Sequence, residues 1–176
     1  MKLRNRAVSL VLASLLIAPG CKGSADPLDP SIPESTQQAA GEPLTLQGRV
    51  SDAAGILPPD AEKRLTKASE RLEKRTKHQL AIVTTPSLRG EDISAYATAL
   101  GNRWGIGRKG ENDGIIVLMA PNERKVRIAV GDGLTGQIPD QISLEIIERD
   151  MVPRFRDGNY VAGIEAGVSA LATRLH

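Results

Sequence analysis

The chain has 176 residues, a formal net charge of +2, a single cysteine, and only one Trp, two Tyr and one Phe. This length suits one domain of ordinary size. The near-neutral charge and the scarcity of aromatic side chains exclude a nucleic-acid-binding protein, because such a protein needs a basic surface and stacking rings. One cysteine excludes an intrachain disulfide and a cysteine zinc cluster.

Residues 1–20 have the layout of a secretory signal peptide. Basic residues at positions 2, 4 and 6 precede an apolar run over residues 7–18, which is too short to span a bilayer comfortably. Small residues then lead to Cys21. Removal of this segment takes away the three basic residues, so the formal net charge falls from +2 to −1.

The segment Ala18-Pro19-Gly20-Cys21 resembles the lipobox of bacterial lipoproteins. That resemblance implies cleavage before Cys21 and attachment of a lipid such as palmitate to this residue. We therefore expect an exported protein anchored to a bacterial membrane. The residue after the lipidated cysteine is Lys22, which favours the periplasmic face of the outer membrane. An Asp at this position would favour the inner membrane. The alternatives are an uncleaved membrane anchor and an ordinary secretory signal with a free thiol, and each still exports the domain.

Residues 21–44 begin with the predicted lipidated cysteine and are expected to form a disordered tether. They contain four prolines, and Ser, Gln, Asp and Glu supply much of the rest. The segment has no apolar periodicity, so it buries too little apolar surface to offset its chain entropy. Such a tether holds the following domain, residues 45–176, off a membrane surface.

The first part of this domain is predicted to contain a strand, a loop, a helix and a second strand. Alternating apolar residues over 44–50 predict a short strand, and residues 51–57 predict a loop. Pro59 suits the first position of a helix. Apolar residues then recur at helical spacing: Ala61, Leu65, Ala68 and Leu72. The apolar and β-branched run at 80–85 predicts a central strand.

Three further helices are expected along the chain. Asp92 is placed to cap the first of them, and Pro139 begins the second. A turn at residues 157–159 precedes the last helix. That helix has one apolar stripe: Tyr160, Ile164, Val168, Leu171 and Leu175.

A β-hairpin lies between these helices. Two apolar runs, 115–120 and 126–130, flank a turn at 121–123. The order strand, helix, strand from 80 to 120 also predicts a parallel pair of strands. The expected fold is therefore α/β: a single three-layer α/β/α sandwich, with a small central sheet that contains a parallel pair and the hairpin.

Three aspartates are expected near one end of the hairpin: Asp113, Asp132 and Asp140. Because hairpin strands are antiparallel, Asp113 before the first strand lies beside the Gly131–Gly133 loop after the second. Oxygen ligands without a nearby His or Cys favour a hard cation such as Ca²⁺ or Mg²⁺. The alternative is that Asp113 and Asp132 serve turns and Asp140 begins a helix.

Nucleotide and triad motifs find little support in the sequence. Two G-x-G-x-x-G matches occur, at 105–110 and 131–136. The first precedes a strand instead of a helix, and the second lacks the later strand that brings a ribose-binding acid, so we expect no nucleotide cofactor. His78 and His176 have no evident Ser or Asp partner, which argues against a catalytic triad.

Six segments occur in the order that is typical of a known family. They are V-S-D-A-A-G-I-L at 50–57, W-G-I-G at 104–107, D-G-I-I-V-L at 113–118, V-G-D-G-L-T-G at 130–136, P-D at 139–140 and R-F-R-D-G-N-Y-V-A-G-I at 154–164. This set resembles the TPM domain over residues 46–175. The resemblance implies an α/β/α sandwich that is often exported and tethered to a membrane. Some members are acid phosphatases, some bind calcium in an acidic pocket, and others act with membrane proteins.

The resemblance identifies Asp52, Asp113 and Asp140 as the matching acidic residues. Family members usually have an aromatic residue where this chain has Asp132. The carboxylate of Asp132 is therefore either an added ligand or a solvated part of the turn. Together these four aspartates are the candidate metal ligands.

Two functions are compatible with this sequence. The first is a lipid-anchored, non-catalytic module of the cell envelope that binds Ca²⁺ or Mg²⁺ and associates with a membrane protein. The second is a metal-dependent acid phosphatase that hydrolyses phosphomonoesters. We favour the first, because phosphoryl transfer needs positioned positive charge and no motif places Arg108, Lys109 or Arg127.

Overall fold

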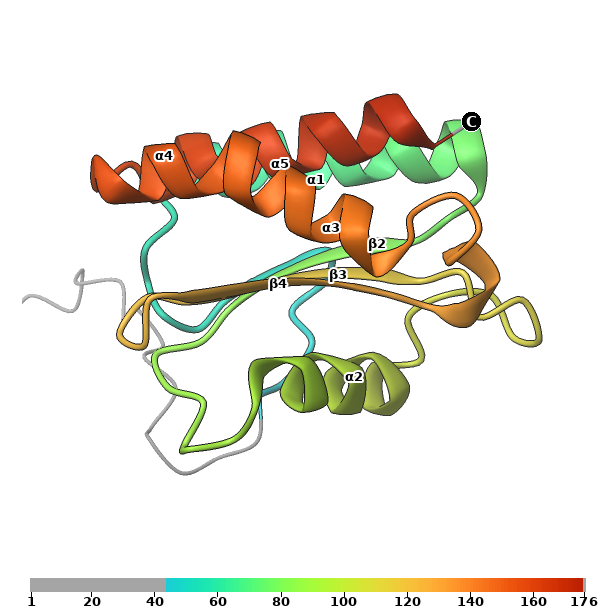
Figure 1. Cartoon of the computed structure of the whole chain (residues 1–176), viewed down its shortest axis with the longest axis horizontal. Coiled ribbons are helices and arrows are strands. Elements are labelled where there is room, and N and C mark those ends of the chain that lie inside the picture. The colour runs from blue at the N-terminus through green and yellow to red at the C-terminus, as the bar shows by residue number, and fades with distance from the viewer. Residues whose placement is uncertain (1–43, 176) are drawn as a thin grey trace, which may run out of the picture. The chain divides into compact units, whose positions relative to one another are not determined.

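The structure, a computed structural model, describes residues 44–175. The predicted signal peptide, the predicted lipidation site Cys21 and all of the predicted tether except Leu44 lie outside the described residues. Within the described part, a small sheet lies between two helical layers (Figure 1). No helix of this part has both the length and the apolar character that a membrane span requires.

The sheet has four strands in the order β1-β2-β3-β4. Their bounds are Val50–Asp52 for β1, Leu80–Thr84 for β2, Ile115–Ala120 for β3 and Lys125–Val130 for β4. The first three strands are parallel, and β4 is antiparallel to β3. The predicted parallel pair and the predicted hairpin are both confirmed.

The described residues form five α-helices and two shorter helical segments. Helix α2 (Ile93–Trp104) lies on one face of the sheet, and its predicted cap is confirmed, since the Asp92 carboxylate accepts hydrogen bonds from two backbone amides. The opposite face is covered by the remaining long helices, α1 (Pro59–Thr76) and α5 (Tyr160–Arg174), and by α3 (Asp140–Ile146). The predicted three-layer sandwich is therefore confirmed.

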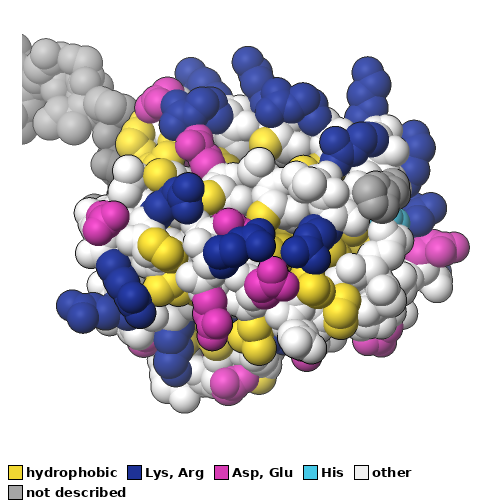
Figure 2. All heavy atoms as spheres, turned by 45° about the horizontal axis from the view of Figure 1, so that its top comes forward, with side chains coloured by type: hydrophobic (Ala, Val, Ile, Leu, Met, Phe, Trp, Pro, Cys, Tyr) yellow, Lys and Arg dark blue, Asp and Glu magenta, His cyan; other side chains and the backbone are white. Residues whose placement is uncertain are grey.

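The segment from α3 to α5 is more elaborate than the single helix predicted after Pro139. Helix α3 continues into the π-helix η2 (Ile147–Met151) and then into α4 (Val152–Arg156). A short 3₁₀ segment, η1 (Asp132–Leu134), precedes α3. Figure 2 shows that Lys and Arg side chains are spread over this helical side of the molecule, with Asp and Glu among them, as expected for a solvated helical surface.

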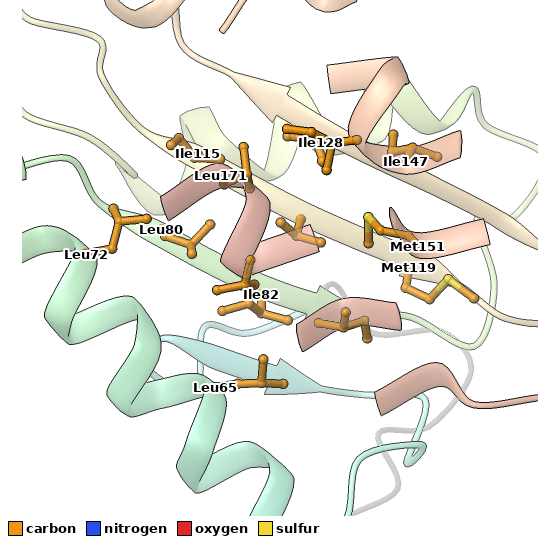
Figure 3. Close-up of a cluster of buried hydrophobic side chains, with 14 of the residues drawn as sticks. Leu65, Leu72, Leu80, Ile82, Ile115, Met119, Ile128, Ile147, Met151 and Leu171 are labelled. Atoms are coloured by element: carbon orange, nitrogen blue, oxygen red, sulfur yellow. The ribbon is translucent and has the colours of Figure 1, made fainter. Parts of the chain in front are cut away.

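Two hydrophobic cores lie on the two faces of the sheet. Because successive strand residues point to opposite faces, Ile82 and Val117 pack toward α1 and α5, whereas Val83 and Leu118 pack toward α2. Figure 3 shows the first core, in which Leu65 of α1 faces the strands. Strands buried on both faces are continuously apolar, which explains the uninterrupted apolar runs in the sequence.

The predicted first strand was misplaced. Residues 44–49 form no strand, and Ser51 and Asp52 belong to β1 instead of the expected loop. Leu44 is nevertheless only 6% exposed and packs in the second core. A strand of three residues is too short to show periodicity, so its position was decided by pairing with β2, in which Ser51 lies opposite Val83.

Candidate functional site

Two loops meet at the end of the sheet where β3 begins. Ile115 pairs with Val130, so the loop before β3 lies beside the loop after β4. Backbone hydrogen bonds join them, from the Gly131 amide to the Gly114 carbonyl at 2.8 Å and from the Gly133 amide to the Asn112 carbonyl at 3.0 Å. The predicted neighbourhood of the Asp113 segment and the Gly131–Gly133 loop is confirmed.

Asp113 is the buried charge of this region, with 2% of its surface exposed. Its Oδ1 accepts a hydrogen bond from the Arg108 amide at 2.7 Å, and its Oδ2 accepts one from the Arg108 guanidinium at 2.7 Å. Burial acts to raise the pKa of the Asp113 carboxyl, but the hydrogen bonds from Arg108 and His78 together outweigh it and lower the pKa to about 2. The carboxylate is therefore ionised, and both of its oxygens have hydrogen-bond partners.

His78 has a partner that the sequence analysis missed. We expected no Asp beside it, and this was wrong, because its Nδ1 lies 2.9 Å from Oδ2 of Asp113. Leu80 pairs with Ile115, and His78 and Asp113 each lie two residues before these paired positions. The register of the parallel strands β2 and β3 would have predicted the contact between His78 and Asp113. His78 is only 8% exposed, so this imidazole is a buried, oriented group.

The glycines of this region allow close packing of backbone. A Cβ on Gly131 would lie 2.0 Å from the Asn112 carbonyl oxygen, and one on Gly133 would lie 1.9 Å from the Glu111 carbonyl oxygen. Neither distance is compatible with a side chain. These two glycines are therefore needed to bring the two loops together, independently of any ligand.

A cavity of about 320 Å³ lies between α2 and these loops, and we call it the glycine pocket. Its polar lining consists of Thr98, Asn102, Asn112 and Asp132, and its apolar lining comes from α2 and from β3 and β4. Asp132 is the only carboxylate among the lining residues, which include no Lys, Arg, His or Cys. The pocket thus offers oxygen atoms and a single negative charge.

A family model described as the TPM domain matches residues 50–174. The chain belongs to the TPM domain family. No match was found among the curated proteins. The similarity therefore identifies a family, while the chemistry of this TPM domain has to be argued from its own residues.

Solved structures of bacterial proteins resemble this TPM domain. The N-terminal domain of a protein from P. gingivalis is 30% identical, with a TM-score of 0.67 over 79% of this chain and 85% of that chain. The N-terminal domain of cg2496 from Corynebacterium glutamicum is 16% identical, with a TM-score of 0.59 over 78% and 86%. The BA42 protein from the psychrophilic bacterium Bizionia argentinensis is 17% identical, with a TM-score of 0.60 over 68% and 81%. The latter two support the fold alone.

Asp52 lies at the opposite end of the sheet of this TPM domain from Asp113. It ends β1, whereas Asp113 precedes β3, and these strands are parallel. Its carboxylate accepts hydrogen bonds from the amides of Leu57 at 2.7 Å and Ile56 at 3.3 Å, and from the Thr84 hydroxyl. Asp52 therefore holds the loop between β1 and α1.

Asp140 stands apart from the other aspartates as well. Its side chain is 77% exposed and forms an ion pair of 2.7 Å with Arg127 in the first half of β4. The structure thus brings the loops of Asp113 and Asp132 together, but not Asp52 or Asp140. Within residues 44–175, no three side chains of Asp, Glu, His or Cys are grouped so that they could hold a metal ion.

Proposed function

We propose that this TPM domain is a non-catalytic module of the cell envelope that binds a hard divalent cation in the glycine pocket. The observation that carries the proposal is the chemistry of the lining, which offers one carboxylate and neutral oxygen-bearing side chains without a cationic group. Lipid attachment at Cys21 would tether the module to a membrane, and the tether and the family resemblance favour a membrane protein as its partner.

The oxygen atoms of the glycine pocket suit Ca²⁺ or Mg²⁺. Both ions prefer carboxylate, amide and carbonyl oxygens, and both keep water molecules where protein ligands are few. Asp132 would supply the charge, and Asn102 and Asn112 would supply amide oxygens. With a single carboxylate, we expect a dissociation constant of roughly 10⁻⁴–10⁻³ M, as in weak extracellular sites.

The two arginines nearest to the candidate aspartates are engaged in ion pairs. Arg108 is bound to Asp113, and Arg127 is bound to Asp140. Neither lines the glycine pocket. Phosphoryl transfer depends on positive charge aimed at the transferred group, so this arrangement favours binding over hydrolysis.

The proposal is tested by titrating Ca²⁺ and Mg²⁺ into residues 36–176 while recording amide resonances by NMR. Residues 44–175 contain both hydrophobic cores, so this part of the chain is expected to fold on its own. We expect saturable shifts at Gly131, Asp132 and Asn112, which Asp132→Asn weakens by about tenfold, as expected for loss of the only charged ligand. Asp157→Asn, a change of another exposed turn aspartate, is the matched control and should leave the titration unchanged.

A phosphatase assay addresses the other function. Hydrolysis of p-nitrophenyl phosphate is measured with each cation for the unmodified domain, Asp132→Asn and Asp157→Asn. We expect no turnover above the buffer rate. Metal-dependent turnover that Asp132→Asn alone abolishes would replace the non-catalytic function with that of an acid phosphatase. An absence of cation-dependent shifts would refute the binding proposal.

A further inference from the structure

A second cavity, of about 540 Å³, lies at the other end of the sheet. It is bounded by the β3–β4 turn and by the junction of α4 and α5, which lie at the same end of the molecule, on the left in Figure 1. Its volume falls in the range of small-molecule sites. It also lies beside the carboxyl end of β3, the edge at which open α/β sheets bind ligands. We call it the basic pocket.

Three cationic side chains line the basic pocket: Arg124, Lys125 and Arg156. No Asp or Glu is among its lining residues. Within residues 44–175, none of these three side chains forms an ion pair or a hydrogen bond, whereas Arg127, in the same strand as Lys125, is paired with Asp140. Lys125 interacts electrostatically with Glu123 and Asp92, so Arg124 and Arg156 carry the positive charge that is left for a ligand.

Neither of the two acidic residues adjacent in sequence to Arg124 and Arg156, which are Glu123 and Asp157, lines the basic pocket. Glu123 precedes Arg124, but its Oε1 accepts hydrogen bonds from the Leu88 amide at 2.8 Å and from the Ser87 hydroxyl at 3.0 Å. These contacts fix the carboxylate on the loop after β2. This carboxylate also attracts Lys125, so Arg124 is the cation of the β3–β4 turn that is left for a ligand.

The other wall of the basic pocket is apolar and aromatic. Phe155 and Tyr160 line it, with ring centroids 5.9 Å apart and planes inclined by 40°. Met119, which is buried at the end of β3, and two valines complete the wall. Gly163 leaves the space that Phe155 occupies, since a Cβ there would lie 2.3 Å from Cε1 of the ring. The motif R-F-R-D-G-N-Y, at residues 154–160, thus builds this wall.

We propose that the basic pocket binds an organic phosphate. Arg124 and Arg156 would hold the phosphate oxygens through their planar guanidinium groups. Two arginines match the double negative charge of a phosphate better than the single charge of a carboxylate. The apolar or aromatic body of the ligand would pack against Phe155 and Tyr160. Such a phosphate group can belong to a soluble compound or to the headgroup of a membrane lipid.

The test uses phenylphosphonate, which carries a phosphate-like group on a ring and has no ester bond to hydrolyse. It is titrated into residues 36–176 in the presence of EDTA, so that the cation site of the glycine pocket plays no part. We expect shifts at Phe155, Gly158 and Tyr160. The affinity for phenylphosphonate should be about tenfold higher than for inorganic phosphate, which lacks the ring, or for benzoate, which lacks the second negative charge. Tighter binding of benzoate would overturn the assignment to phosphate.

A double variant and its control test whether phenylphosphonate binds in the basic pocket. Arg124→Gln with Arg156→Gln should weaken phenylphosphonate binding by about tenfold or more. Arg71→Gln with Arg103→Gln removes the same charge from two other exposed arginines without ion pairs in the described residues, and should change the affinity less than twofold. Equal losses in both variants, or shifts that map elsewhere, would overturn the proposal. Equal melting temperatures of the variants would show that both are folded.

Vesicles distinguish the two sources of phosphate. Sedimentation with phosphatidylglycerol vesicles is compared with phosphatidylcholine vesicles. Binding to phosphatidylglycerol that the Arg124/Arg156 variant loses and the Arg71/Arg103 variant keeps would assign the pocket to a lipid headgroup. Binding of phenylphosphonate without vesicle binding would assign it to a soluble organic phosphate. Failure of both probes would overturn the proposal, and neither outcome depends on cation binding at Asp132.

Discussion

Nδ1 of His78 lies 2.9 Å from Oδ2 of Asp113, although the two residues are 35 positions apart in the chain. The contact joins the segment between α1 and β2 to the loop before β3. Arg108 binds the same carboxylate from the solvent side, with about half of its own side chain exposed. This cluster therefore fixes the loops that carry the glycine pocket, and its role is to position them.

Acid should weaken the domain through Asp113. Its pKa is lowered from an ordinary 3.8 to about 2 in the folded protein, so the stabilisation is fully present above the ordinary pKa and is lost as the pH falls from about 4 toward 2. The shift corresponds to about 2 kcal/mol of unfolding free energy. Urea unfolding at pH 7, 4 and 3 measures this loss.

The Asp113→Asn variant isolates this contribution from other titrating groups. At pH 7 we expect it to be less stable than the unmodified domain by roughly 2–3 kcal/mol, because Arg108 and His78 lose their charged partner. The difference should shrink as the pH falls toward 3. A difference that stays constant from pH 7 to pH 3 would contradict the assignment.

The two loops at the glycine pocket should not tolerate a methyl group at Gly133. Its Cβ would lie 1.9 Å from the Glu111 carbonyl oxygen, so Gly133→Ala must push the loops apart, at a cost of roughly 2–3 kcal/mol in unfolding free energy. Gly136→Ala is the control, since no atom lies within 4 Å of its Cβ and its φ is not positive. Thermal unfolding of both variants checks the prediction, which requires Gly136→Ala to be neutral or slightly stabilising.

Asp52 should matter for stability and not for cation binding. Asp52→Ala removes the acceptor of two amides and the Thr84 hydroxyl, and we expect a loss of roughly 2–3 kcal/mol. The Ca²⁺-dependent shifts at Asp132 should persist, because the two residues lie at opposite ends of the sheet. Loss of those shifts in folded Asp52→Ala would support the metal-ligand role that the family resemblance implies.

Cys21 should determine where the protein is found in the cell. Cys21→Ser removes the thiol that would receive the lipid, so we expect the protein to move from the membrane fraction to the soluble periplasmic fraction. Fractionation followed by detection of the domain measures this change. Ser24→Ala, a change three residues downstream, is the control, and an unchanged membrane fraction in Cys21→Ser would argue for an uncleaved anchor.

Local patterns in the sequence determined most of the fold. The helical spacing after Pro59, the cap at Asp92 and the paired apolar runs of the hairpin each reflect contacts within a few residues, and all three were predicted. The family was also recognisable from short motifs. A hairpin constrains its own ends, so the loop beside Asp113 was predictable as well.

The side-chain neighbours at the two ends of the sheet were decided only by the tertiary structure. His78 meets Asp113 because β2 and β3 pair in one particular register, and Asp52 is separated from Asp113 because parallel strands place their beginnings and ends on opposite edges of the sheet. Arg124 and Arg156 share the basic pocket only because η2 carries the chain from α3 to α4 above the β3–β4 turn. Strand register and helix packing depend on side chains far apart in the chain, and no local periodicity records them.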